Sequence, residues 1–208
     1  MTPSGEARAH VYPAAPPSAG CTLVLGHGAG GGISARDLHA VAVGLPARGI
    51  TVVLVEQPWR VAGNRVAAAP ARLDQAWLAV LADPQVRAVV PGTLAVGGRS
   101  AGARVACRTA TAVRCDAVVC LAFPLHPPGR PDRSRADELL GAGVRTLVVQ
   151  GERDPFGGPE QLPAGPSIVG VPFADHGFAV PASSPLTQPQ ALALLVDAVC
   201  RFLTGRLA

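Results

Sequence analysis

Residues Thr93–Ala112 read TLAVGGRSAGARVACRTATA, and this stretch decides the fold. Thr93–Val96 is a short apolar run typical of a buried strand, and Ala101–Ala112 has the pattern of a helix. Between them lies a G-x-S-x-G sequence, Gly98-Arg99-Ser100-Ala101-Gly102. A tight turn from strand to helix needs small residues two positions before and two positions after the serine, because that serine has a strained backbone. The stretch therefore predicts a nucleophile elbow with Ser100 at its tip.

Short β-branched runs alternate with helical patterns along the rest of the chain, as in parallel strands joined by helical crossovers. We expect an α/β fold with a mostly parallel, six-stranded sheet and helices on both of its faces. The expected strands are Cys21–Leu25, Ile50–Val55, Thr93–Val96, Ala117–Leu121, Thr146–Gln150 and Ser167–Val171. The expected helices are Ala35–Arg48, Arg72–Ala82, Ala101–Ala112, Ala136–Gly141 and Pro189–Leu203. Open parallel sheets bind ligands at the carboxyl ends of their strands, where the unusual residues of this chain concentrate.

The length and composition favour one folded domain. A chain of 208 residues with 49% apolar residues suits a single core. We expect residues 1–20 to form a Pro- and Ala-rich extension, loose or at the sheet edge, and residues 21–208 to form the domain. Residues 122–135, between a predicted strand and the next helix, are too few for a helical cap, so we expect an open pocket.

Charge and cysteine usage limit the partners and the compartment. The 18 basic residues, all of them arginine, and the 14 acidic residues are scattered, which argues against a nucleic-acid partner. The composition suits a GC-rich bacterial genome. The five cysteines form no C-x-x-C pair and mostly lie in apolar segments, as buried thiols do in a reducing compartment. With no pattern of a signal peptide or a membrane span, the expected location is cytoplasmic.

A serine nucleophile needs a base and an acid that orients it, which follow the serine in the order acid, then histidine. Asp154 follows the fifth predicted strand and precedes Pro155, and His176 follows the last predicted strand. The sequence therefore predicts a catalytic set of Ser100, Asp154 and His176. Glu152 and Asp175 are rival acids, although Asp175 is the chain neighbour of His176 and reaches its ring poorly.

A second Gly-rich turn, Gly26–Gly32 (GHGAGGG), follows the first predicted strand. Its glycines let the backbone approach a substrate, so the amide of Ala29 or Gly30 is expected to form an oxyanion hole with that of Ala101. His27 is interpreted as a structural turn residue. The alternative is a nucleotide-binding loop with Glu56 as its acidic partner, but the chain has no P-loop lysine and that motif leaves Ser100 unexplained.

Together these motifs resemble the α/β-hydrolase superfamily from about Cys21 to Val180. The segments Phe123–Gly129 (FPLHPPG) and Gln150–Gly157 (QGERDPFG) are similar to a small, lid-less, dienelactone-hydrolase-like group. That group is related to testis-expressed protein 30 and to the third regulatory subunit of the nonspecific-lethal complex. The resemblance implies a Ser-His-Asp triad at Ser100, His176 and Asp154, with no metal and no organic cofactor. Ala103 stands where relatives commonly carry glycine.

The predicted function is hydrolysis of a small ester, thioester or lactone through an acyl-enzyme, by a monomer or small homo-oligomer that contacts no membrane. An anionic group on the substrate is a further hypothesis, based on Arg60 and Arg99. Two alternatives remain open: a catalytically silent binding or scaffold protein, and an acyltransferase with the same catalytic residues. The expected pocket walls are Pro58, Trp59, Arg60, Arg99, Pro124, Leu125, His126 and Phe178.

Overall fold

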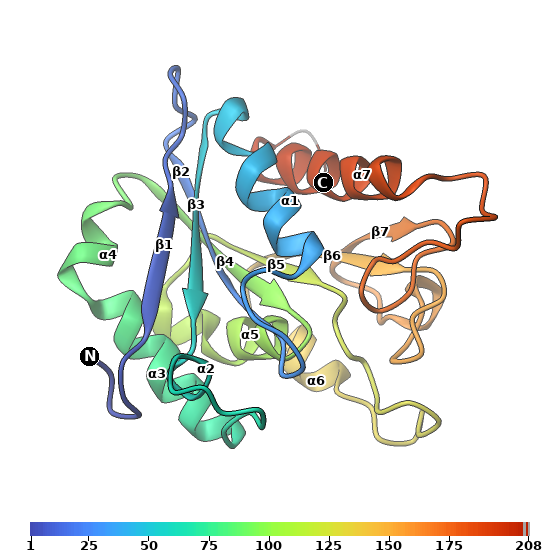
Figure 1. Cartoon of the computed structure of the whole chain (residues 1–208), viewed down its shortest axis with the longest axis horizontal. Coiled ribbons are helices and arrows are strands. Elements are labelled where there is room, and N and C mark those ends of the chain that lie inside the picture. The colour runs from blue at the N-terminus through green and yellow to red at the C-terminus, as the bar shows by residue number, and fades with distance from the viewer. Residues whose placement is uncertain (206, 208) are drawn as a thin grey trace.

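Seven strands form one sheet with helices on both faces in the computed structural model, which describes residues 1–205 and 207 (Figure 1). Across the sheet the strand order is β1-β3-β2-β4-β5-β6-β7, and every neighbouring pair is parallel except β1 and β3. The predicted α/β fold class is confirmed. The strands are β1 (Arg8–Tyr12), β2 (Cys21–Gly26), β3 (Ile50–Glu56), β4 (Thr93–Arg99), β5 (Ala117–Leu121), β6 (Arg145–Gly151) and β7 (Ser167–Val171).

Two helical layers enclose the sheet. The helices are α1 (Arg36–Gly44), α2 (Pro58–Val61), α3 (Pro70–Ala82), α4 (Pro84–Ala88), α5 (Ala101–Val113), α6 (Ala136–Leu140) and α7 (Gln188–Leu203), with 3-10 turns η1 (Pro46–Arg48) and η2 (Pro159–Gln161). Helices α1 and α7 cover one face, and α3, α5 and α6 cover the other (Figure 1). Successive strand residues alternate between the two cores: Leu23 and Leu25 point toward α1 and α7, and Val24 points toward α3 and α5.

The sheet has one strand more than the six that the sequence predicted. Strand β1 lies within residues 1–20 and pairs antiparallel with β3, with Val11 opposite Val53. As an edge strand it buries little, and Val11 keeps 44% of its surface exposed. Strand β1 therefore lacks the continuous apolar run that marks the buried strands.

The first predicted helix was too long. Helix α1 ends at Gly44, and a separate 3-10 turn begins at Pro46, whose ring and missing N–H stop an α-helix. Gly44 also permits the close approach of α7, since a Cβ there would lie 2.8 Å from Val196 Cγ1. Helices α2 and α4, of four and five residues, were not predicted from the sequence.

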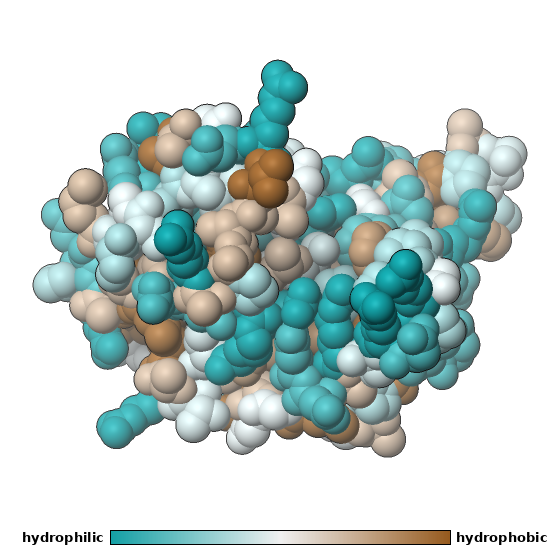
Figure 2. Space-filling view, turned by 90° about the horizontal axis from the view of Figure 1, so that it is seen from below, coloured by the Kyte–Doolittle hydropathy of each residue, from teal (hydrophilic) through white to brown (hydrophobic). Residues whose placement is uncertain are grey.

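The parallel strands end at one edge of the sheet, and the loops after β2, β4, β5, β6 and β7 meet there. Figure 2 shows the molecule from this side, with hydrophilic residues gathered across the middle of the face. No helix among the described residues is long and apolar enough to cross a membrane. Positions 206 and 208, in the last part of the predicted domain, lie outside the described residues.

Candidate active site

Ser100 occupies the turn between β4 and α5 in a conformation that few non-glycine residues adopt. Its φ is 53° and its ψ is −110°. The Ser100 amide donates to Leu121 O (2.9 Å), which ties the turn to the end of β5. Helix α5 begins at the next residue, so its first amides have no acceptor within the helix and face the region of the serine hydroxyl. This geometry matches the predicted elbow.

The two glycines of the elbow are required by contact with strand β2. A Cβ on Gly98 would lie 2.6 Å from Gly26 O, and one on Gly102 would lie 2.5 Å from the same oxygen. Even one methyl group at either position would overlap the backbone. The glycines thus allow the turn, and the helix after it, to pack directly against the end of β2.

The structure brings together the three residues predicted for catalysis. His176 Nε2 lies 2.9 Å from Ser100 Oγ, and His176 Nδ1 lies 2.8 Å from Asp154 Oδ2. The Asp154 side chain is fully buried, whereas the His176 side chain keeps 17% of its surface exposed. A buried carboxylate on one nitrogen and a hydroxyl on the other form a continuous hydrogen-bonded chain that ends in the cavity.

Two residues that the sequence did not identify as part of the site support the hydrogen-bonded chain of Ser100, His176 and Asp154. Gln150, fully buried on β6, donates from Nε2 to Asp154 Oδ2 (2.9 Å), and the Phe156 amide donates to Asp154 Oδ1 (2.8 Å). The Phe156 ring packs on the imidazole of His176, with centroids 4.2 Å apart. One signal was available in the sequence: Gln150 is a polar residue that directly follows the apolar run Leu147–Val149 near the end of its strand.

Both rival acids have other partners. Asp175 Oδ1 accepts hydrogen bonds from the amides of Gly177 (2.8 Å) and Ala179 (2.9 Å), so it caps its own turn. Glu152 is exposed, and its carboxylate accepts from the Phe173 amide at 3.3 Å. Asp154 is thus the carboxylate that contacts His176.

The Gly-rich turn after β2 lies against the elbow. A Cβ on Gly28 would approach Ser100 Cβ to 3.4 Å, and the predicted oxyanion residues Ala29, Gly30 and Ala101 line the same cavity as Ser100. His27 lies behind this turn: its Nδ1 is 2.9 Å from Gly28 O, and its Nε2 accepts from the Gln57 amide (3.1 Å). Burial lowers the pKa of His27, which favours the neutral ring that these contacts require.

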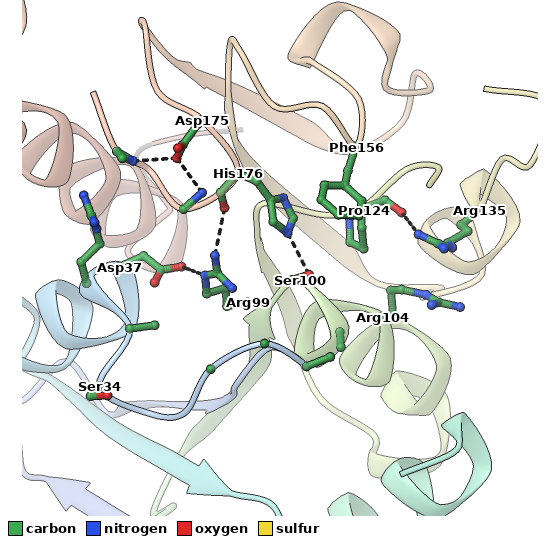
Figure 3. Close-up of a pocket in the computed structure, with 18 residues that line it drawn as sticks. Ser34, Asp37, Arg99, Ser100, Arg104, Pro124, Arg135, Phe156, Asp175 and His176 are labelled. Atoms are coloured by element: carbon green, nitrogen blue, oxygen red, sulfur yellow. Dashed lines mark hydrogen bonds and ion pairs between the residues drawn. The ribbon is translucent and has the colours of Figure 1, made fainter. Parts of the chain in front are cut away.

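Arg99, the residue between Gly98 and Ser100 in the elbow, is turned toward the protein. Its Nε lies 3.2 Å from Oδ2 of the fully buried Asp37, and its Nη2 donates to His176 O (3.2 Å; Figure 3). Burial raises the pKa of Asp37, and the charge of Arg99 opposes that rise. Arg99 therefore links α1, the elbow and the histidine loop.

The cavity beside Ser100 has a volume of about 810 Å³ and is open to solvent. Arg99 and Pro124 line it as expected, but Pro58, Trp59, Arg60, Leu125, His126 and Phe178 do not. The chain turns inward after β3 and β5, so Trp59 packs on His27 and Leu125 is buried; Phe178 is fully buried. Residues not predicted take these places in the cavity wall, among them Ser34, Arg36, Asp37, Arg104, Arg135 and Phe156.

Within the part of the chain that the structure describes, no group of three or more His, Cys, Asp and Glu side chains is placed to hold a metal ion. The five cysteines are free thiols, and four of them are buried. Burial raises the pKa of Cys21 and of Cys115 to about 11, so these thiols stay protonated. None of the five lines the cavity.

A family model described as an alpha/beta hydrolase domain matches residues 19–204. The chain belongs to the alpha/beta hydrolase family. No curated protein matches it. The closer relationship to testis-expressed protein 30 and to the nonspecific-lethal subunit is therefore not confirmed and stays a prediction.

Solved structures share the fold of this alpha/beta hydrolase over nearly its whole length. A serine hydrolase without a lid from Xanthomonas campestris is 24% identical, with a TM-score of 0.72 over 97% of this chain and 91% of that one. A dienelactone hydrolase from Anabaena variabilis is 18% identical, with a TM-score of 0.71 over 100% and 95%. Est1E from Butyrivibrio proteoclasticus is 16% identical, with a TM-score of 0.70 over 96% and 94%.

Proposed function

We propose that this alpha/beta hydrolase is a serine hydrolase that cleaves a small ester, thioester or lactone through an acyl-enzyme. The observation that carries the proposal is the hydrogen-bonded chain from Ser100 through His176 to Asp154, with contacts of 2.9 and 2.8 Å. Ser100 is the nucleophile, His176 the general base and Asp154 the residue that orients the imidazole. Each hydrogen bond is short enough for proton transfer or for fixing a tautomer.

The mechanism follows from which atom holds each proton. Asp154 accepts the Nδ1–H of His176, which leaves the lone pair of Nε2 directed at the Ser100 hydroxyl. His176 takes that proton as Ser100 Oγ attacks the substrate carbonyl, and then gives it to the departing alcohol or thiol. Water, activated by the same histidine, attacks the acyl-enzyme, releases the acid and restores Ser100.

The charge that develops on the carbonyl oxygen needs donors fixed in advance. The backbone amide of Ala101, at the start of α5, and that of Ala29 or Gly30 are the proposed donors. Ala101 belongs to the first turn of a 13-residue helix, where free amides and the helix dipole both favour negative charge.

The open cavity supports a small substrate. It is lined by loops and by the first turns of α1 and α5, and no helix of the described residues forms a cap above Ser100, so a long acyl chain would stay exposed to water. Among structures of the same fold, one is named a dienelactone hydrolase and another binds ferulic acid, which is consistent with small esters and lactones. We further propose a cytoplasmic monomer or small homo-oligomer that binds neither nucleic acid nor membrane.

A fluorescent fluorophosphonate tests the proposal without knowledge of the substrate, because it labels an activated serine. We expect strong labelling of the wild type and none of Ser100→Ala; His176→Ala should be labelled at least about 100-fold more slowly. Circular dichroism would verify that each variant is folded. A folded wild type that is not labelled would contradict the proposal and favour a binding module. Products formed in the presence of added alcohols would distinguish hydrolysis from acyl transfer.

A further inference from the structure

Arginine side chains line two sides of the cavity beside Ser100. They differ in whether a carboxylate forms an ion pair with them. On one side, Arg99 is matched by Asp37, and Arg36 is exposed to water with its Nη1 donating to Gln188 Oε1 (2.8 Å). On the other side, beyond Pro124, lie Arg104 and Arg135 (Figure 3). An anion gains least from a guanidinium that is already paired or fully solvated. Arg104 is paired with Glu138, so the better candidate for binding charge is Arg135, which forms no ion pair among the described residues.

Arg104 belongs to a cluster of three guanidinium groups and two carboxylates. The members are Arg104, Arg108, Arg135, Asp74 and Glu138. Its Nε and Nη2 donate to the two oxygens of Glu138 at 2.7 and 2.6 Å. Arg108 pairs with Asp74 (2.6 Å) and also reaches Glu138 (3.1 Å). Burial alone would raise the pKa of Glu138, but the hydrogen bonds and charges of Arg104 and Arg108 outweigh it and lower the pKa. Both acids are thus used by these two arginines.

Arg135 is the third guanidinium of this cluster. It is half-buried, it lines the cavity, and its Nη1 donates to the backbone oxygen of Pro124 (2.8 Å). Among the described residues, no carboxylate forms an ion pair with it. Burial, and then the charge of Arg104, lower the pKa of Arg135, and the charge of Glu138 only partly offsets this. Arg135 therefore keeps a positive charge beside the nucleophile with most of its donors available.

We infer that Arg135 binds a carboxylate group carried by the substrate. A guanidinium presents two parallel N–H donors that match the two oxygens of a carboxylate. The substrate would then be a small ester, thioester or lactone with a second, ionised carboxyl group, held beyond Pro124 while its carbonyl meets Ser100. This inference rests on the proposed function. It moves the predicted anion contact from Arg60, which does not line the cavity, and from Arg99, which is paired with Asp37.

The test compares 4-nitrophenyl hydrogen glutarate and 4-acetoxybenzoate with their methyl esters, which lack the charge. The first probe carries the carboxylate on the acyl side and the second on the leaving group, so the pairs show which side Arg135 contacts. In Arg135→Gln we expect kcat/KM to fall about 10- to 100-fold for at least one carboxylate probe. The matched methyl ester should change less than about twofold, because it makes no charged contact.

Two variants serve as controls. Arg133→Gln removes the same charge from an exposed position of the same loop, and Arg36→Gln removes it from the other side of the cavity. An equal loss in Arg133→Gln would show a general charge effect, and a selective loss in Arg36→Gln alone would place the anion elsewhere. An equal loss for charged and neutral probes in Arg135→Gln would show that Arg135 only supports the Pro124 loop. Each of these three results would overturn the inference.

A binding measurement separates this inference from the proposed function. Calorimetry would measure the affinity of folded Ser100→Ala for 4-acetoxybenzoate and for monomethyl glutarate, which carry the carboxylate on the leaving-group and acyl side respectively, with and without Arg135→Gln. Affinity that falls about tenfold or more with Arg135→Gln supports the carboxylate site even if the wild type neither turns over the ester nor reacts with fluorophosphonate. Unchanged affinity for both ligands overturns the site, even if Ser100 proves to be a working nucleophile.

Discussion

The Nε of Arg99 lies 3.2 Å from Oδ2 of Asp37, a carboxylate with no solvent exposure in the first turn of α1. The same guanidinium donates to the backbone oxygen of His176 (3.2 Å). The residue between glycine and serine in the elbow motif is therefore an internal brace that fixes the histidine loop relative to the elbow. Its long, charged side chain is explained by a buried counter-charge.

Arg99→Ala should destabilise the protein strongly, because it leaves Asp37 buried and unpaired. We expect the free energy of unfolding in urea to fall by about 3 kcal/mol or more. The double variant Arg99→Ala/Asp37→Asn removes the unpaired charge and should recover at least half of that loss. If the double variant were as unstable as the single one, the charge pair would not be the cause.

The stability of Arg99→Ala should also depend on pH in a defined direction. Burial raises the pKa of Asp37 above its ordinary value of 3.8, so the folded protein holds this proton at a pH where the unfolded chain has lost it. Stability then falls as the pH rises through the folded-state pKa. Urea unfolding from about pH 4 to pH 8 should show Arg99→Ala approaching wild type at the acidic end. A loss in the free energy of unfolding that stays the same at every pH would contradict this prediction. The double variant Asp37→Asn/Arg99→Ala is the control, because it lacks the titrating carboxyl group.

Gly102→Ala tests the packing of the elbow. The new Cβ would lie 2.5 Å from Gly26 O and 2.6 Å from Gly26 C, both backbone atoms of the central strand β2. We expect a loss of at least about 2 kcal/mol in the free energy of unfolding, because neither element can move away without disturbing the sheet. Gly31→Ala is the matched control, since nothing lies within 4 Å of a Cβ there. Similar stability of the two variants would refute the requirement for close packing.

Much of this site could be predicted from the sequence because its residues follow buried strands. The apolar runs located β4, β6 and β7, although β4 continues to Arg99, three residues past its predicted end at Val96. Parallel strands bring their carboxyl ends to one edge of the sheet. Ser100, Asp154 and His176 follow these ends, so order along the chain was enough to group them. The same argument failed for β1, which is a half-exposed edge strand without an apolar run.

The cavity walls were predicted poorly, because the direction of a loop side chain depends on tertiary packing. Trp59 and Leu125 lie within a few residues of a strand end, as wall residues would, yet both point into the core. Arg135 lies just before α6, and nothing in the sequence directs it to Ser100. Arg104 lies one helical turn after Ser100 on α5, but the sequence does not show that its side chain lines the cavity. Tertiary contacts make them neighbours: Arg104 on α5 pairs with Glu138 on α6, and Arg135 donates to the backbone oxygen of Pro124.

Phe156→Ala should lower turnover while the fold survives. The Phe156 ring lies against the imidazole of His176, with centroids 4.2 Å apart and a tilt of 33°, and so restricts the rotation of the general base. The backbone amide that binds Asp154 remains in the variant, so the orienting carboxylate keeps its position. We expect kcat for 4-nitrophenyl acetate to fall about tenfold with KM nearly unchanged, because a histidine that samples several rotamers is less often aligned with Ser100.

The matched control for this last variant is Phe173→Ala. Phe173 is 39% exposed and precedes the histidine loop without lining the cavity, so its removal should leave kcat close to that of wild type. Phe156→Leu, which keeps an apolar group against the ring, should recover part of the loss in kcat. If Phe156→Ala raised KM and left kcat intact, the ring would be a substrate contact in the cavity wall. Its role in positioning His176 would then be disproved.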